Sequence, residues 1–158
     1  IIKEKIILDR IDYDASNGSA STRGNDHSST RGGREIFLQY VSLDKSKLFA
    51  LLRLRIPSNY TKEGSTLKPI KVVPLKVLRN SAVIREVHTY GKMTEINKKD
   101  SKSPQHIGLG KKLLLTAEKI AKKEFGIKKI AVISGIGARN YYRKTGYRLK
   151  NTYMVKDL

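Results

Sequence analysis

A short glycine-containing segment is the part of the sequence whose residue types point most directly to chemistry: Gln105-His106-Ile107-Gly108-Leu109-Gly110. Gly108 and Gly110 have no Cβ, so an anionic group can approach the main chain closely. The residues that follow predict a helix over Leu109–Phe125, whose first amides lack partners within the helix and whose dipole is positive at that end. Such a helix start, with Lys111 beside it, predicts a site for a phosphate-bearing ligand.

The glycine spacing excludes two common nucleotide-binding motifs. A Walker A loop needs an earlier glycine and a longer spacing before its lysine, and a dinucleotide fingerprint needs three glycines directly after a strand. Neither pattern is present here. A pyrophosphate-bearing ligand is the main candidate, and an ordinary turn before a helix is the alternative.

Three polar side chains alternate along a strand predicted over Ala82–Tyr90. Strict alternation places Glu86, His88 and Tyr90 on one face, and Glu86 or His88 is suited to act as a general base. The alternatives are an ion pair with an arginine of a neighbouring strand for Glu86 and a structural, hydrogen-bonded role for His88. With three scattered histidines and no cysteine in the chain, we expect no metal site.

Two adjacent tyrosines, Tyr141 and Tyr142, form a second candidate group, in a helix predicted over Ala138–Lys144. Neighbouring positions on a helix point about 100° apart, so at most one ring is expected in the core while the other faces a cleft. A phenol there is suited to donate a proton to a leaving thiolate or to hold a thioester carbonyl. We expect the glycine segment, the face with Glu86 and His88, and both tyrosines to converge on one crevice.

The remaining pattern predicts the framework that positions these groups. Strands are expected over Lys5–Tyr13, Glu35–Leu43, Leu48–Ile56, Ile70–Val77 (interrupted by Pro74), Lys129–Ser134 and Tyr147–Val155, the last as a strand or a hairpin. Residues 14–33 are polar, repeat Ser-Thr-Arg-Gly, and are expected to form a flexible loop. The order of elements predicts a single domain over residues 1–158, of α/β or α+β class, with a mixed, mostly antiparallel sheet flanked by helices.

Charge is the strongest compositional signal. Lys and Arg number 33 against 14 Asp and Glu, a formal net charge of +19. This balance favours a polyanionic partner, either nucleic acid or a phosphorylated cofactor, over a merely solubilising lysine-rich surface. No apolar run approaches the ~20 residues of a membrane span and no signal peptide is visible, so we expect a cytoplasmic protein without membrane contact.

Several segments resemble known families. Gln105–Gly110 resembles the R/Q-x-x-G-x-G/A acetyl-CoA signature of the Gcn5-related N-acetyltransferase (GNAT) fold. Other segments are similar to the C-terminal acetyltransferase domain of the Elongator catalytic subunit, the radical S-adenosylmethionine tRNA uridine(34) acetyltransferase family, and favour an archaeal member: Leu51–Arg55, Ile84–Gly91, Lys129–Tyr147 and Tyr153–Lys156. The resemblance extends from Ile7 to Lys156.

The resemblance implies the acetyl-CoA-binding domain of a tRNA-modifying acyltransferase. Acetyl-CoA would supply a carboxymethyl group to C5 of wobble uridine 34, with tRNA-dependent hydrolysis of the thioester. S-adenosylmethionine and a 4Fe-4S cluster are implied only for an N-terminal radical domain that is missing from this chain, which agrees with the absence of cysteine. That domain, tRNA and, in eukaryotes, other Elongator subunits are the implied partners.

Site residues follow from the resemblance by motif. The cofactor-binding residues are Gln105, His106, Ile107, Gly108, Leu109, Gly110, Lys111, Tyr141 and Tyr142, and the catalytic residues are Glu86, His88, Tyr141 and Tyr142. One departure is the polar stretch within residues 14–33, which interrupts a turn that the family usually passes through directly.

Two other functions remain open from the residues. A protein (histone) lysine N-acetyltransferase needs a base for the amine and an acidic groove for a basic peptide, and the sequence offers few acidic residues. A non-catalytic tRNA-binding module predicts salt-dependent binding of tRNA without turnover of acetyl-CoA.

Overall fold

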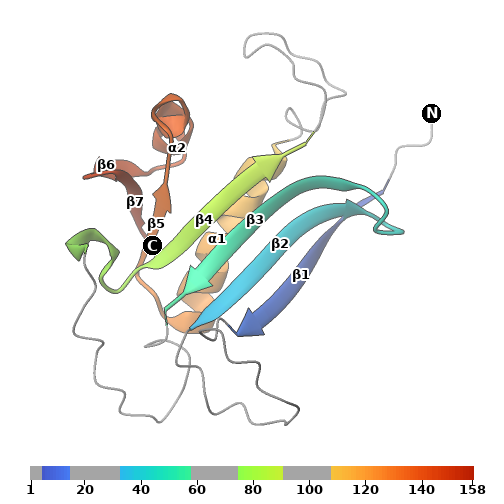
Figure 1. The fold of residues 1–158 in the computed structure, drawn as a ribbon, viewed down its shortest axis with the longest axis horizontal. Coiled ribbons are helices and arrows are strands. Elements are labelled where there is room, and N and C mark those ends of the chain that lie inside the picture. The colour runs from blue at the N-terminus through green and yellow to red at the C-terminus, as the bar shows by residue number, and fades with distance from the viewer. Residues whose placement is uncertain (1–4, 15–32, 58–74, 91–107) are drawn as a thin grey trace.

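The computed structural model describes residues 5–14, 33–57, 75–90 and 108–158 (Figure 1). Its elements in chain order are β1 (Ile6–Asp14), β2 (Arg34–Ser42), β3 (Leu48–Ile56), the 3₁₀ turn η2 (Lys76–Leu78), β4 (Ala82–Thr89), α1 (Leu109–Phe125), β5 (Lys129–Ile133), the 3₁₀ turn η3 (Ile136–Ala138), α2 (Arg139–Lys144), β6 (Arg148–Lys150) and β7 (Tyr153–Asp157). The predicted stretch 15–32 and the predicted glycine-segment residues 105–107 lie outside these ranges.

Within the described ranges, seven strands form one sheet in the order β1-β2-β3-β4-β5-β7-β6. β4 and β5 are parallel and the other neighbouring strands are antiparallel. The mixed, mostly antiparallel sheet predicted from the sequence is therefore confirmed. The last predicted strand is a hairpin of β6 and β7, which turns at Asn151 with φ of 55°.

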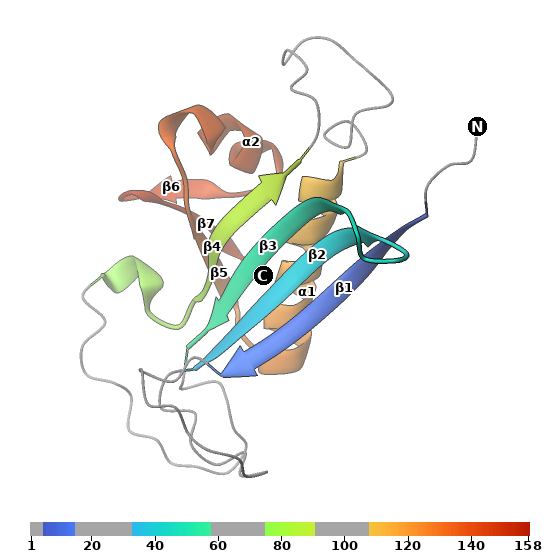
Figure 2. The ribbon, with the colours of Figure 1, turned by 45° about the vertical axis from the view of Figure 1, so that its right-hand side comes forward.

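Helix α1 packs across one side of β2, β3 and β4 (Figures 1 and 2). Its apolar residues recur at helical spacing and are buried: Leu109, Leu113, Leu114, Ala117, Ile120 and Ala121. On the sheet they meet the fully buried Leu52 and Leu54, whose neighbours Arg53 and Arg55 point to the other side of β3. Each large aliphatic side chain buried in this layer contributes about 1.5–3 kcal/mol, so the layer is the main source of stability.

Strand β4 contains a β-bulge near its middle. Leu54 of β3 pairs with Ile84, and the preceding Arg53 pairs with Glu86. Arg85 is therefore an extra residue, and two residues of β4 lie opposite one residue of β3. Beyond this point, the alternation of side chains along β4 is shifted by one position.

The bulge decides which β4 side chains share a face. Ile84 before it and Val87 and Thr89 after it lie on the α1 side, where Ile84 and Val87 pack into the core and Thr89 approaches the start of α1. Glu86 and His88 lie on the opposite side. Strict alternation over Ala82–Tyr90, as predicted from the sequence, would also place Ile84 on the face of Glu86 and His88. It is wrong here because the extra residue changes the register.

β4 and β5 separate soon after they begin to pair. Their register covers only Ala82–Ile84 against Ile130–Val132. Beyond these residues, β4 continues along β3 while β5 turns towards α2, so the two parallel strands diverge (Figure 1). The divergence opens one end of the sheet between the start of α1 and α2.

The 3₁₀ turn η2 differs from the prediction. The sequence predicted an extended segment over Ile70–Val77, whereas Lys76–Leu78 form a turn and residues 70–74 lie outside the described ranges. Val77 is buried there against Ala131 and Val155, on the side of the sheet away from α1. This tertiary contact favours the turn, and the local sequence pattern does not reveal it.

Among the described residues, no helix is both long and apolar enough to cross a membrane.

A buried tyrosine ties the C-terminal hairpin to α1. Tyr147 is only 2% exposed, and its hydroxyl donates a hydrogen bond of 3.0 Å to Oε1 of Glu118. Lys156 of β7 donates to Oε2 of the same carboxylate at 2.7 Å. Burial, and then the negative charge of Glu118, raise the pKa of the Tyr147 hydroxyl well above its usual value.

We expect Tyr147→Phe to lower the free energy of unfolding by about 1.5–3 kcal/mol at pH 7, since it removes a hydrogen bond to a charged group. Because the pKa of Tyr147 is raised in the folded state, its contribution is fully present below pH 10.0, the usual pKa, and is lost as pH rises further. Chemical unfolding of both proteins at a series of pH values measures this. The stability difference should narrow above pH 10, and a difference that is independent of pH would contradict the expectation.

Candidate active site

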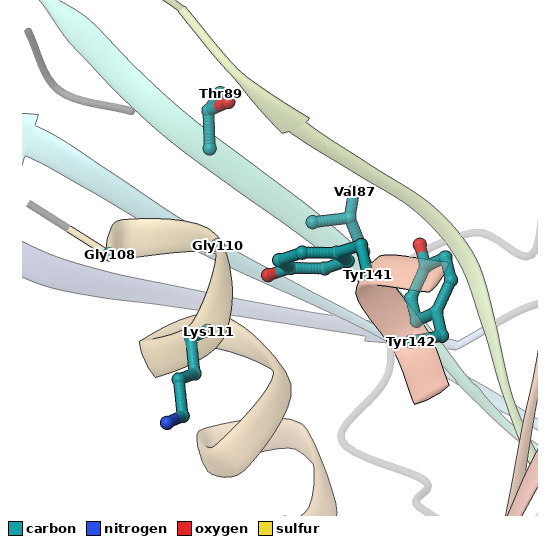
Figure 3. Close-up of a pocket in the computed structure, with 7 residues that line it drawn as sticks. All are labelled: Val87, Thr89, Gly108, Gly110, Lys111, Tyr141 and Tyr142. Atoms are coloured by element: carbon teal, nitrogen blue, oxygen red, sulfur yellow. The ribbon is translucent and has the colours of Figure 1, made fainter. Parts of the chain in front are cut away.

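A cavity of about 420 Å³ lies where β4 and β5 diverge (Figure 3). Three elements supply its lining: the end of β4, the start of α1, and α2. The lining residues are Val87, Thr89, Gly108, Gly110, Lys111, Tyr141 and Tyr142. Five of them were predicted from the sequence as site residues, namely the two glycines, Lys111 and the two tyrosines.

The start of α1 presents to this cavity backbone amides that have no acceptor within the helix. Gly108 precedes the helix in the left-handed conformation, with φ of 69°, and its carbonyl accepts the first helical hydrogen bond from Lys112 at 3.0 Å. The amides of Leu109, Gly110 and Lys111 therefore have no acceptor within the helix. The first turn has no acidic residue and no side-chain cap, so nothing on the helix competes with an incoming anion.

Gly110 permits close contact between α1 and α2. A Cβ at this position would lie 3.0 Å from the Tyr141 hydroxyl oxygen and 3.5 Å from Cγ2 of Thr89. Any other residue would have to displace the Tyr141 hydroxyl or narrow the cavity. The cavity thus fits a ligand whose phosphate lies at the start of α1 and whose remainder extends past Tyr141. Leu109 contributes only its backbone, because its side chain is in the core.

The two tyrosines have different environments. Tyr141 is 41% exposed and its ring extends across the cavity towards Gly110, whereas Tyr142 is 7% exposed and packs edge-on against Tyr141 and Tyr147 (Figure 3). Burial raises the pKa of both hydroxyls, and for Tyr142 the neighbouring Tyr141 adds to the effect. Both phenols are therefore protonated at neutral pH and act as hydrogen-bond or proton donors.

Glu86 and His88 do not lie with the tyrosines. Glu86 forms an ion pair with Arg53, with 2.9 Å between Oε1 and Nε, although that N–H is not aligned for a hydrogen bond. His88 lies 3.4 Å from the same carboxylate and stacks on Tyr90. The bulge turns this group to the face opposite the cavity, so the predicted convergence on one crevice is incomplete. The catalytic role assigned to Glu86 and His88 stays a prediction without support from this geometry.

Val87 and Thr89 line the cavity although sequence reasoning did not select them. Both are ordinary strand residues, and only the bulge directs them to the α1 side. Regular alternation of side chains along β4, without a bulge, would place both residues on the opposite face of the sheet, so no pattern in the sequence indicated their role in the site. The predicted cofactor-binding residues Gln105, His106 and Ile107 lie outside the described ranges.

Comparison with solved structures defines the class of the fold. An acetyltransferase of the GNAT family from Staphylococcus aureus Mu50 aligns over 78% of this chain and 68% of its own, with a TM-score of 0.50 and 15% sequence identity. At this identity the likeness concerns the fold alone. The mixed sheet, the divergence of β4 and β5 and the helix start between them are those of a GNAT-fold domain, as the resemblance implied. No family model matches the sequence.

Closer relatives identify the family. Over 80% of its own length, the chain is 43% identical to Elongator complex protein 3 of Bos taurus. Over 96% of its own length, it is 38% identical to a tRNA uridine(34) acetyltransferase of Dehalococcoides mccartyi. The Elp3 structure of Methanocaldococcus infernus aligns over 97% of the chain, with 37% identity and a TM-score of 0.65. The chain spans 21%, 28% and 30% of these three proteins, respectively. It is a homologue of one segment of the Elongator complex protein 3 and tRNA uridine(34) acetyltransferase family.

Proposed function

We propose that this chain is the acetyl-CoA-binding domain of a tRNA-modifying acyltransferase that adds a carboxymethyl group at C5 of wobble uridine 34. The observation that carries the proposal is the cavity in which the bare N-terminus of α1 meets the hydroxyl of Tyr141. The names of the homologues support tRNA uridine as the acceptor. We further propose that residues 1–158 form one domain, with an insertion within residues 14–33.

Acetyl-CoA fits the donor groups that line this cavity. The amides of Leu109, Gly110 and Lys111 would hold the pyrophosphate, with the Lys111 ammonium adding positive charge at the same end. The pantetheine and acetyl groups would follow the gap between β4 and α2, past Val87 and Tyr141. Gln105, His106 and Ile107 would extend the phosphate site by motif.

In this proposal, Tyr141 assists cleavage of the thioester. In hydrolysis the carbon–sulfur bond breaks, water supplies the oxygen that the acyl carbon gains, and the sulfur takes up a proton. A phenol with a raised pKa remains protonated at neutral pH, so it can donate that proton or hydrogen-bond the thioester carbonyl beforehand. Tyr142 is packed on two sides by aromatic rings, and we assign it the role of fixing the position of Tyr141.

The residues of this chain do not fit an iron–sulfur cluster, because the sequence contains no cysteine. S-adenosylmethionine and a 4Fe-4S cluster are therefore assigned, as part of the proposal, to the portion of the longer relatives that this chain does not span. In the proposed reaction, a domain equivalent to that portion would activate the acetyl methyl group. This chain would position the thioester.

A protein lysine acetyltransferase receives less support from the site. Such an enzyme needs a base near the thioester to deprotonate an amine, and none of the described lining residues is a carboxylate or histidine. Glu86 and His88 lie across β4 from the cavity, and five of the seven lining residues are apolar or aromatic. The tRNA acceptor accordingly agrees better with the described geometry.

The test of the proposed function is calorimetric titration of the 158-residue chain with acetyl-CoA, followed by release of free thiol with and without tRNA. We expect saturable binding in the 1 μM to 1 mM range typical of enzyme substrates, at ~1:1 stoichiometry, and faster thiol release with tRNA. Transfer of labelled acetyl to a lysine-rich peptide would favour the lysine acetyltransferase instead. Binding of tRNA without binding of acetyl-CoA would favour the non-catalytic module.

A further inference from the structure

The last part of the chain carries far more positive than negative charge, with Asp157 its one acidic residue after Glu124. Residues 126–156 contain no Asp or Glu, and their cations are Lys128, Lys129, Arg139, Arg143, Lys144, Arg148, Lys150 and Lys156. Within the described ranges, only Lys156 among these has an ion pair, which it forms with Glu118. A concentration of unpaired cations on one part of a protein surface is typical of sites that bind polyanions.

Three of these cations share the face of the sheet opposite α1. Arg148 lies opposite Val155, and Lys150 lies opposite Tyr153, so the two cations alternate with Leu149 along β6. Lys129 occupies the same face of β5. Residues on the other face of these strands point to α1, as the ion pair between Lys156 and Glu118 shows. We call the surface formed by Lys129, Arg148 and Lys150 the outer basic face.

Two cations of the outer basic face, Lys129 and Lys150, affect each other electrostatically. Burial lowers the pKa of Lys129, the positive charge of Lys150 lowers it further, and Asp157 offsets only part of the effect. Like charges held together by the fold are destabilising until an anion binds between them. Arg148 and Lys150 are both exposed on β6, the edge strand, so a ligand can reach them.

A row of residues on the same face of the sheet as the outer basic face runs from β6 to the end of β5. Lys150, Tyr153 and Ile133 lie side by side across β6, β7 and β5. Ile133 is 57% exposed and ends β5 on the side where that strand diverges from β4. The row therefore leads a linear ligand from the edge strand β6 to the end of β5, where β5 diverges from β4.

We propose that the outer basic face binds the phosphodiester backbone of RNA. Alternate residues of a strand are about 6.6–6.8 Å apart, so Arg148 and Lys150 present a repeated charge to a repeated anion. Arginine contacts phosphate with two donors and lysine with a point charge, and such contacts position a nucleic acid without reading its sequence. The choice of RNA over another polyanion rests on the proposed function, in which tRNA is the substrate.

The test is the salt dependence of tRNA binding to the 158-residue chain, measured by fluorescence anisotropy with labelled bulk tRNA. We expect R148Q/K150Q to weaken binding at least fivefold at moderate salt and to reduce the slope of log K against log[salt] by about 1.4, or ~0.7 for each lost contact. The matched control is K122Q/K123Q, which removes two exposed lysines from α1. It should leave both quantities almost unchanged.

Three results would overturn the proposal: equal weakening by the two double variants, absence of tRNA binding by the wild type, or poly-glutamate binding as tightly as tRNA and with the same loss in R148Q/K150Q. The first would indicate diffuse charge, and the last an acidic protein partner. Calorimetry with acetyl-CoA on the same proteins separates the two proposals. We expect R148Q/K150Q to bind acetyl-CoA normally, and a wild type that binds tRNA but not acetyl-CoA would contradict only the proposed function.

Discussion

Gly108→Glu is expected to abolish acetyl-CoA binding, with at least a 100-fold loss of affinity, or about 2.8 kcal/mol. The residue immediately precedes the amides of α1 that have no acceptor within the helix, and among the described residues no atom beyond its chain neighbours lies within 4 Å of a Cβ added there. A carboxylate at this position would occupy the anion site and repel the pyrophosphate. Calorimetric titration of the variant measures the loss.

The matched control is Gly126→Glu at the other end of α1. Gly126 also has a positive φ, of 63°, and no atom within 4 Å of its added Cβ, so the two substitutions cause similar backbone strain. A glutamate is stabilising at a helix N-terminus and destabilising at a helix C-terminus. Gly126→Glu should therefore lose more stability than Gly108→Glu and yet keep its affinity for acetyl-CoA. Equal affinity of Gly108→Glu and the wild type would refute the proposed phosphate site.

Tyr141→Phe is expected to slow tRNA-dependent thioester cleavage by about 100-fold, while acetyl-CoA affinity changes by less than about threefold. The substitution removes only the hydroxyl and keeps the ring that spans the cavity. A change in the rate constant without a change in affinity identifies a group that acts during the reaction. Thiol release at saturating acetyl-CoA gives the rate, and calorimetry gives the affinity.

Two comparisons locate the effect of Tyr141. Tyr142→Phe keeps the buried ring that packs on Tyr141 and should retain most of the rate. Glu86→Gln changes a group on the other face of β4 and should not alter the reaction at the cavity. A loss of rate in Glu86→Gln equal to that in Tyr141→Phe would instead return the catalytic role to the residue predicted from the sequence.

Local signals account for the features that the sequence predicted well. The bounds of α1 are those expected, Leu109–Phe125, because the apolar spacing, the glycine before the helix and Gly126 after it all act within a few residues. The hairpin of β2 and β3 follows from alternation and a short turn in the same way. Motif and spacing also placed Gly108, Gly110 and the two tyrosines at one site.

Features that depend on the pairing between strands were not accessible in this way. The bulge at Arg85 arises from the register of β4 against β3, and Arg85 itself donates a hydrogen bond of 2.9 Å to the buried Glu35 of β2. The sequence around position 85 contains no pattern that predicts this contact. As a result, Val87 and Thr89 were missed as lining residues, and Glu86 and His88 were expected at the wrong face.

The divergence of β4 and β5 has a consequence for how the domain tolerates substitutions. The opening between these strands is created by the course of the main chain, and side chains only line it. Substitutions at Thr89 or Tyr141 can therefore alter the shape of the cavity while the core between α1 and the sheet stays intact. The shape of the cavity and the stability of the core can thus change independently of each other.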